Sequence, residues 1–328
     1  MGSLPILEIE RLSIVINTGG EKVYPVQDIS CRVYKGDRIG IVGESGSGKS
    51  IFALSIGNLL TPGVFSVKAE KFRFLDYNLL NLSESSWQKI RGTHIGYVFQ
   101  ESLVSLNPHL TVGTQLTEHL VAHRGVSKKD AQKSAVDILA KLQLSDPISR
   151  MKMYPHQLSG GMRQRIAIAM ALMLTPTLII ADEPTTALDA TLQVQIVNLL
   201  NIISREYGSS VIFITHDLSL LANFSSHIWV MYGGKILETA PVECLYREPL
   251  HPYTKILISI RHNLEEKKIL KTIPGSPPDM KTLYPGCPFY DRCRFAKEEC
   301  NNSAVSLVEL LPNHYTACTL VQKGEITL

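Results

Sequence analysis

The sequence predicts an α/β fold in which a parallel sheet carries a phosphate-binding loop. Residues 38–43, "RIGIVG", form an apolar strand pattern that leads directly into the glycine-rich segment "GESGSGKS" and then into a helical pattern. After residue 170, short apolar strands alternate with helical segments, which is typical of a parallel sheet. Two of these strands end in polar residues, Asp182-Glu183 and His216, and ligands bind where the ends of parallel strands meet.

The N-terminal half is expected to supply three strands, a helix and then a helical insert. Residues 6–16 alternate roughly between apolar and polar, which suits an edge strand, and residues 23–43 contain two further strand patterns. Residues 51–60 have the apolar spacing of a helix. Residues 101–158 contain segments with apolar positions three and four apart and few β-branched runs, so this stretch predicts a helical insert.

The C-terminal half first shows alternating strand and helix patterns and then changes in composition. Residues 177–184 and 211–217 are strand patterns with a helical pattern between them, and residues 228–240 predict a closing hairpin around two glycines. The proline-rich tract 273–280 is poor in helix and strand formers, so we place a domain boundary between about 240 and 270.

The expected organisation is therefore a domain at 1–250, with a helical subdomain at about 101–158, and an extension at 251–328. A length of 328 residues suits one large domain plus an appendage, or two domains. The formal net charge of +3 is spread without long blocks of one sign and is too weak to indicate nucleic-acid binding. The longest apolar run, 166–181, is too short for a membrane span, and no signal-peptide pattern is present, so we expect a cytoplasmic protein.

The glycine-rich segment matches the phosphate-loop pattern G-x-x-x-x-G-K-[ST] at every fixed position. Backbone N–H groups of such a loop surround a β-phosphate, and the following helix directs its positive N-terminus at the same group. We expect Lys49 to bridge the β- and γ-phosphates and the hydroxyl of Ser50 to ligate Mg²⁺. The residues of this predicted ATP site are Gly43, Glu44, Ser45, Gly46, Ser47, Gly48, Lys49 and Ser50.

Two adjacent carboxylates end the apolar strand "TLIIADEP" at 177–184. Packing does not explain them, because an unpaired buried charge is costly to desolvate. Beside a phosphate loop, Asp182 is expected to lie near Mg²⁺ and to act through a water molecule. Glu183 is expected to polarise the water that attacks the γ-phosphate. In isolation, such a pair would equally suit a solvated turn.

Two further polar residues follow apolar segments. His216 comes after "VIFIT", and at a strand tip it can reach the γ-phosphate, although a lone histidine is more often structural. Gln100 comes after "YVF", and its amide can touch Mg²⁺ or the attacking water. By itself, a glutamine in this place would be uninformative.

A second serine-glycine turn, "LSGGM" at 158–162, also opens onto a helical pattern and is therefore a second anion site. Two such loops of one chain cannot wrap one ATP tightly from the same face, and hydrolysis needs stabilised charge on the open side of the γ-phosphate. We therefore expect this turn to close over an ATP that a different subunit holds. The residues expected to do so are Ser159, Gly160, Gly161 and Met162.

In this order, "GESGSGKS", Gln100, "LSGGM", "LIIADEP", "ALDA" at 187–190 and "THD" resemble the motif series of ATP-binding cassette (ABC) ATPases. The resemblance covers residues 1 to about 250 and is highly specific as a set. It implies the P-loop NTPase fold of an ABC ATPase domain, with an antiparallel β subdomain and a helical subdomain. It also implies that Asp189 lies at the interface of two ATPase subunits, and that the helical insert receives the coupling helices of a permease.

One position departs from the family pattern. Such ATPases usually stack adenine on an aromatic residue of the first hairpin, and Ile16 stands in that place with Tyr24 nearby. No residue is therefore assigned to the adenine.

The tail resembles the C-terminal extension of ATP-binding subunits in dipeptide and oligopeptide importers. The resemblance is carried by "HPYTKILISI", "IPGSPPDM", "GCPFYDRCRFAKEEC" and "HYTAC". Four of the six cysteines lie here, with five, six and seventeen residues between neighbours: Cys287, Cys293, Cys300 and Cys318. Four cytoplasmic thiols suit a [4Fe–4S] cluster or a zinc ion, and unligated thiols are a third alternative. The spacing lacks the tight C-x₂-C pairs of most zinc ribbons, and the resemblance favours iron–sulfur.

The resemblance implies an ATPase subunit of a peptide importer, peripheral to the cytoplasmic face of the inner membrane. The implied partners are a second, different ABC ATPase subunit, two permease subunits and an extracytoplasmic substrate-binding protein. Nickel or other metal-chelate cargo is the alternative within transport. A soluble ABC ATPase acting on DNA or ribosomes, or a metal-bearing nucleic-acid module, is disfavoured because the chain has one cassette, no heptads and no basic–aromatic tract.

Overall fold

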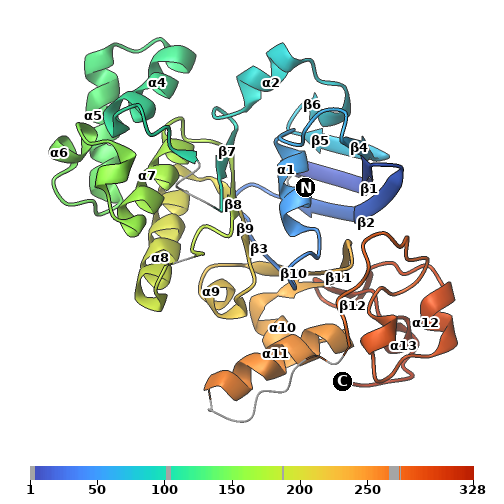
Figure 1. Cartoon of the computed structure of the whole chain (residues 1–328). Coiled ribbons are helices and arrows are strands. Elements are labelled where there is room, and N and C mark those ends of the chain that lie inside the picture. Colours follow the sequence, from blue (N-terminus) through green and yellow to red (C-terminus); the bar gives the residue numbers. More distant parts are fainter. Residues whose placement is uncertain (1–3, 101–104, 187, 266–272, 274) are drawn as a thin grey trace. The chain divides into compact units, whose positions relative to one another are not determined.

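The computed structural model describes residues 4–328 apart from 101–104, 187, 266–272 and 274 (Figure 1). The first four residues of the predicted helical insert, Ala187 of the "ALDA" motif and Pro274 of the proline-rich tract lie outside the described residues. The chain forms two compact units. The discontinuous unit comprises Met1–Asn81 with Thr215–Leu328, and the central unit comprises Leu82–Ile214.

A five-stranded antiparallel sheet belongs to the discontinuous unit. Its strands are β1 (Leu7–Thr18), β2 (Glu21–Val33), β4 (Phe65–Lys68), β5 (Lys71–Phe74) and β6 (Tyr77–Asn78). On one face of β1, alternate side chains are buried, including Leu7, Ile9, Leu12 and Ile14. A change of register between Ile9 and Leu12 shifts this alternation, and Arg11 there has a positive φ of 53°.

The expectation of an edge strand at residues 6–16 is wrong. Strand β1 pairs with β2 and also with β4 and β5, so both of its sides are hydrogen-bonded. The rough alternation in the sequence arises from the change of register at Arg11 and not from an exposed edge.

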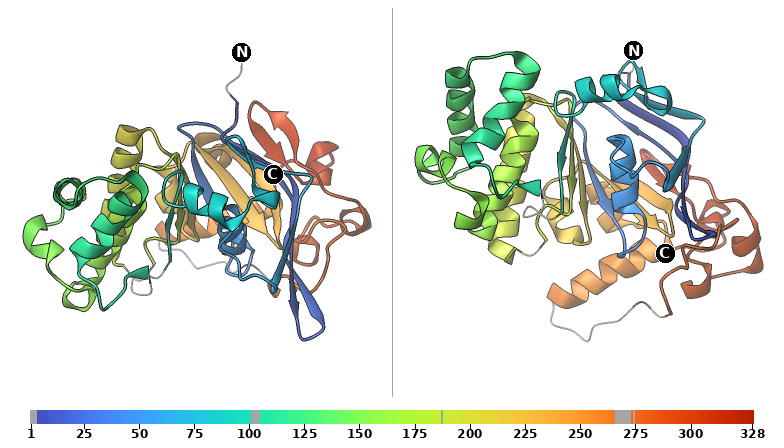
Figure 2. Two further views of the ribbon diagram at one scale, coloured as in Figure 1. Left: turned by 90° about the horizontal axis from the view of Figure 1, so that it is seen from above. Right: turned by 45° about the horizontal axis from the view of Figure 1, so that its top comes forward.

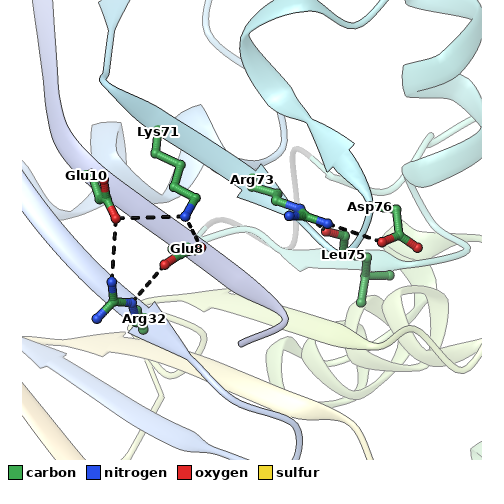
Figure 3. A network of polar contacts seen from close by, with 7 residues as sticks. All are labelled: Glu8, Glu10, Arg32, Lys71, Arg73, Leu75 and Asp76. Carbon is green, nitrogen blue, oxygen red and sulfur yellow. Dashed lines mark hydrogen bonds and ion pairs between the residues drawn. The ribbon is translucent and has the colours of Figure 1, made fainter. Parts of the chain in front are cut away.

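Charged side chains cover an exposed part of the same strands (Figure 3). Glu8 accepts from Arg32 of β2 at 2.9 Å and pairs with Lys71 of β5 at 2.7 Å. The hydrogen bond from Lys71 and the further contact with Arg32 hold the pKa of Glu8 below its usual value. Because the partners are largely exposed to water, these pairs align neighbouring strands and add little stability.

The second group of strands in the discontinuous unit follows the order β12-β13-β11-β10-β3. Their bounds are β3 (Arg38–Val42), β10 (His227–Tyr232), β11 (Lys235–Pro241), β12 (Val308–Leu311) and β13 (His314–Thr316). Strand β10 is parallel to β3 and antiparallel to β11, which confirms the hairpin predicted around Gly233 and Gly234. The helices of this unit are α1 (Lys49–Ile56), η1 (Leu79–Asn81), α9 (Leu218–Ala222), α10 (Val242–Arg247), α11 (Pro252–Glu265), η3 (Tyr290–Arg292), α12 (Glu298–Asn302) and α13 (Thr319–Gln322).

The C-terminal part of the discontinuous unit lies beside β2 (Figure 2). The N–H of Tyr24 donates to the carbonyl of Met280 at 2.7 Å, and Gln27 exchanges hydrogen bonds with Thr282 and Tyr284. The main chain of the tail is thus attached to β2 by one main-chain hydrogen bond and by the side-chain amide of Gln27.

The central unit contains parallel strands and most of the longer helices. Strand β8 (Leu178–Asp182) pairs in parallel with β7 (Ile95–Val98) and with β9 (Ser210–Thr215). Every residue of β8 and β9 is buried, as expected for parallel strands covered on both faces. The helices are α2 (Glu84–Ile90), α4 (Val112–Arg124), α5 (Lys128–Lys141), α6 (Pro147–Met151), η2 (Pro155–Gln157), α7 (Gly160–Leu172) and α8 (Ala190–Tyr207).

Side-chain caps start the main helices of this unit. Thr111, Ser127, Ser159 and Asp189 each accept a hydrogen bond from a backbone N–H in the first turn of the helix that follows. Among the helices that the structure describes, none is long and apolar enough to cross a membrane.

Candidate functional site

The candidate nucleotide loop, residues 43–48, joins β3 to α1 in the discontinuous unit. Three glycines are required by its geometry. A Cβ on Gly43 would lie 2.1 Å from the carbonyl oxygen of Met231, and one on Gly48 would lie 1.9 Å from that of Pro25. Gly46 and Gly48 also have φ values of 78° and 96°, which other residues rarely adopt. The pattern of glycines is therefore dictated by close backbone approach and by turn conformation.

Lys49, the first residue of α1, places a buried positive charge against the candidate nucleotide loop. Its side chain is 5% exposed, and Nζ donates to the carbonyl oxygens of Gly43 and Glu44, each at 2.9 Å. A buried ammonium group is favourable only with strong acceptors, and a phosphate is such an acceptor. Ser50 follows in the first turn of α1, where the helix dipole also favours an anion.

The sequence prediction missed the residues that hold Glu44 of this loop. The guanidinium of Arg292 donates to the Glu44 carboxylate at 2.8 Å, and the hydroxyl of Tyr253 accepts from the Glu44 N–H at 3.0 Å. Arg292 and Tyr253 lie in the "DRC" and "HPYT" segments of the tail, and no local pattern connects them with the loop.

His216 of the discontinuous unit directly follows β9, and its side chain is exposed. The next residue, Asp217, caps the short helix α9 by accepting from the N–H of Ser219 at 2.7 Å. The turn after β9 is thus fixed by Asp217, and His216 is presented to the solvent at the strand end.

Two acidic residues at the end of β8 lie in the central unit, and their environments differ. Asp182 is 5% exposed and accepts a hydrogen bond from the hydroxyl of Tyr97 at 3.3 Å. Burial, together with the Asp182 charge, raises the pKa of Tyr97, so that this hydroxyl remains a donor. Sequence reasoning did not single out Tyr97.

Glu183 is half-buried and has a positive φ of 43°, a conformation that is strained for a residue with a side chain. Its N–H donates to the carbonyl of Ile214 at 3.0 Å, and its carboxylate accepts from Thr186 at 2.9 Å. Gln100 donates to the same carboxylate oxygen at 3.4 Å. The structure therefore brings together Gln100 and Glu183, which the sequence analysis had predicted separately.

The candidate signature turn, 158–162, presents its polar groups outward from the start of α7. Ser159 caps this helix by accepting from the N–H of Met162 at 3.4 Å, and both Ser159 and Gly160 are exposed. A Cβ on Gly160 would meet no atom within 4 Å, whereas one on Gly161 would lie 3.3 Å from Leu192 of α8. An exposed helix N-terminus of this kind is open to an external anion.

Asp189 is also exposed, and it caps α8 by accepting from the N–H of Leu192 at 3.0 Å. This contact gives Asp189 a local structural role. Its predicted place at a subunit interface stays a prediction.

The four tail cysteines line one small cavity together with His251. The Sγ of Cys287 lies 3.7 Å from Nε2 of His251, and the Cys287 N–H donates to the carbonyl of Cys300 at 2.8 Å. Burial raises the pKa of Cys287 to about 12 and that of Cys318 to about 11. His251 was not among the predicted residues.

The side-chain positions do not support the predicted metal or iron–sulfur site directly. Within the residues that the structure describes, no group of three His, Cys, Asp or Glu side chains is gathered in a way that could hold a metal ion. The chemistry of the donor set nevertheless fits a thiophilic group, because four thiols face one cavity and all four are free of disulfides.

Two families match different parts of the chain. Residues 26–186 match the family described as "ABC transporter", and residues 237–300 match "Oligopeptide/dipeptide transporter, C-terminal region". The first match contains the candidate nucleotide loop, Glu183 and the candidate signature turn, and the second contains three of the four tail cysteines.

Similar proteins share most of the length of the chain. The oligopeptide transport ATP-binding protein OppD of Salmonella typhimurium is 42% identical over 95% of this chain and 93% of its own. The dipeptide transport ATP-binding protein DppD of Bacillus subtilis is 44% identical over 88% of this chain and 86% of its own. Among solved structures, a dimer of the ATP-binding cassette MJ0796 with bound ADP and phosphate superposes with a TM-score of 0.63, at 30% identity over 72% of this chain and 98% of the cassette. The predicted cassette fold is thereby confirmed.

Proposed function

Because this chain belongs to the family of oligopeptide and dipeptide ABC transporter ATP-binding proteins, we propose that it hydrolyses ATP to drive peptide import through a membrane permease. The observation that carries the proposal is the presence, in one chain, of a glycine-fixed loop with buried Lys49 and of the C-terminal region found in peptide transporters. Nickel or metal-chelate cargo is not favoured, since the similar proteins named above transport peptides.

The candidate nucleotide loop binds the phosphates of ATP. Its N–H groups and the N-terminus of α1 surround the β-phosphate, and Lys49 exchanges carbonyl partners of the loop for phosphate oxygens. Ser50, Gln100 and Asp182 would hold Mg²⁺, which neutralises phosphate charge when bound. The oxygen-rich donor set fits a hard cation of this kind.

Glu183 accepts a proton from the attacking water. Thr186 and Gln100 orient its carboxylate through donation to one oxygen, and the strained backbone at Glu183 sets the direction of the side chain. His216, at the end of β9, contacts the γ-phosphate and so distinguishes the state with γ-phosphate from the state without it. These roles account for the polar residues Gln100, Glu183 and His216, which the packing of the core does not require.

Ser159, Gly160, Gly161 and Met162 act on the ATP of a second subunit. Their exposure at the start of α7 supports this role, as does the dimeric state of the similar cassette solved with ADP and phosphate. We infer that the second subunit is a different ABC ATPase and that Asp189 lies in the interface.

The assembly that follows from this role is peripheral to the cytoplasmic face of the inner membrane. The helical insert contacts two permease subunits and couples ATP hydrolysis to their conformational change. An extracytoplasmic substrate-binding protein delivers the peptide. The ATPase domain comprises about residues 1–250, and the cysteine-rich extension comprises 251–328.

The extension carries a thiolate-bound group in the mature protein. Cys287, Cys293, Cys300 and Cys318 would hold a [4Fe–4S] cluster, with zinc as the alternative; support comes from the single cavity that they line. Such a group cross-links and stabilises a region that has only a small apolar core.

Transport in reconstituted vesicles tests the proposal. The complete transporter, with its permease and binding protein, is expected to take up a labelled di- or oligopeptide only when ATP is supplied on the side of the membrane where this chain lies. A Lys49→Ala variant is expected to abolish uptake. Uptake of a nickel chelate without uptake of any peptide would overturn the cargo assignment, and uptake that needs no ATP would overturn the energetic role.

A further inference from the structure

An arginine of the tail reaches the candidate nucleotide loop across 248 positions of sequence. Nη1 of Arg292 donates to the carboxylate of Glu44 at 2.8 Å and to the hydroxyl of Tyr232 at 2.9 Å. The Arg292 side chain is 6% exposed and that of Glu44 is 23% exposed. A charge pair so removed from water is screened little, so its geometry is well defined.

The carboxylate, the N–H and the carbonyl of Glu44 each have a hydrogen-bond partner. Arg292 binds the carboxylate, and Tyr253 accepts from the N–H at 3.0 Å. Lys49 and the N–H of Ser47 donate to the carbonyl at 2.9 and 3.2 Å. Two of these four partners, Arg292 and Tyr253, lie beyond residue 250. Glu44 is therefore held at its carbonyl by residues near it in sequence, and at its N–H and its carboxylate by residues of the tail.

The two tail partners of Glu44, Tyr253 and Arg292, pack against buried aromatic rings. The ring of Tyr253 lies 4.6 Å from that of Tyr232 and 5.3 Å from that of Phe289, centroid to centroid. All three rings are buried, and Arg292 lies over Tyr232 at 5.7 Å. Packed rings of this kind have little rotamer freedom, so they place the hydroxyl of Tyr253 and the guanidinium of Arg292 with little entropy cost.

The same short segment also borders the cysteine cavity. Arg292 ends the turn η3, whose N–H groups bond back to the preceding residues, and Cys293 follows directly. Cys287 begins this segment and bonds through its carbonyl to the N–H of Tyr290 at 3.0 Å. Any change in the cavity that moves this turn thus moves Arg292 as well.

We propose that Arg292 is a positioning residue for nucleotide binding: through Glu44 it holds the candidate nucleotide loop in the geometry that receives phosphate. The order of the tail and the affinity for ATP are therefore coupled. A preorganised loop binds without first losing conformational entropy, whereas a released loop must lose it on binding. The proposal rests on the proposed function only in that residues 43–50 bind ATP.

Equilibrium titration of the full chain with a non-hydrolysable ATP analogue and Mg²⁺ tests the coupling. Arg292→Ala and Glu44→Gln are each expected to weaken binding about five- to tenfold, a typical coupling between linked sites. The double variant is expected to bind no more weakly than either single variant, because both changes remove one interaction. Arg292→Lys is expected to restore part of the affinity.

Arg294→Ala is the matched control, since Arg294 lies two residues away, is exposed and stacks on Phe295. Its affinity is expected to equal that of the unaltered chain. Should Arg292→Ala fail to fold, Arg292→Lys and Glu44→Gln keep the test intact.

A second readout follows from linkage, which requires the nucleotide to stabilise the tail as the tail stabilises the loop. Amide exchange across residues 287–293 is expected to slow when the analogue binds, and this effect is expected to disappear in Arg292→Ala. A lower melting temperature with unchanged affinity would show that the pair only fastens the tail, and would overturn the proposal. Additive effects in the double variant would overturn it as well.

Lys49→Ala is measured in parallel, so that a failure of the positioning role of Arg292 can be told from a failure of the assigned ATP site. If it weakens binding and Arg292→Ala does not, the positioning role fails alone. If Lys49→Ala binds normally, the assignment of residues 43–50 as the ATP site fails.

Discussion

Gln100 donates from Nε2 to Oε2 of Glu183 at 3.4 Å, and Thr186 donates to the same oxygen at 2.9 Å. The glutamine follows β7 and the glutamate follows β8, two adjacent parallel strands. Because both donors bind the same oxygen, they fix the orientation of the Glu183 carboxylate. The first prediction concerns the replacement of this carboxylate by an amide.

Glu183→Gln is expected to bind ATP normally and to lower turnover by at least about 100-fold, because an amide cannot take a proton from water. ATPase assays of the complete transporter measure turnover, and titration of the chain measures binding. Thr186→Val serves as the control, since it removes one hydrogen bond and leaves the carboxylate, and its turnover is expected to fall much less. Ordinary turnover in Glu183→Gln would remove this residue from the mechanism.

Two loop glycines offer a matched pair. Gly46 and Gly48 both have positive φ, but an added Cβ meets nothing at Gly46 and lies 1.9 Å from Pro25 O at Gly48. Gly46→Ala is expected to cost about 1 kcal/mol of stability from backbone strain alone. Gly48→Ala is expected to cost more and to abolish ATP binding, because β2 must move. Thermal unfolding and ATP titration check both; equal effects would show that close approach is unimportant.

Ser159 combines a cap with a proposed contact to the ATP of a second subunit. Ser159→Ala is expected to lose about 1 kcal/mol of unfolding free energy, as is Ser127→Ala, which removes the cap of α5. Only Ser159→Ala is expected to slow ATP hydrolysis by the assembled transporter. If Ser127→Ala slows hydrolysis equally, the loss reflects stability and not the interface.

Metal content tests the cysteine site. A chain purified without oxygen is expected to be brown, with about four iron atoms per chain by elemental analysis. Cys287→Ser is expected to lose the colour, whereas Cys244→Ser, outside the cavity, is expected to keep it. A colourless chain with one zinc ion would contradict the iron–sulfur assignment.

Local patterns in the sequence predicted the features that depend on neighbouring residues. The loop glycines could be predicted because turn conformation and close approach constrain positions 43–48 directly. The edge position of residues 6–16 could not, since alternation reports a buried face and not the number of pairing strands. The contact of Gln100 with Glu183, and that of Arg292 with Glu44, join residues 83 and 248 positions apart, and no spacing rule reaches so far.

The discontinuous unit has a consequence for synthesis on the ribosome. Its strands β3 and β10 are made almost two hundred residues apart, while the central unit between them is continuous and emerges whole. The candidate nucleotide loop is therefore synthesised long before Tyr253 and Arg292 leave the exit tunnel. The hydrogen bonds that join Glu44 to Tyr253 and Arg292 can thus form only after residues 253–292 have been made, long after Glu44 itself.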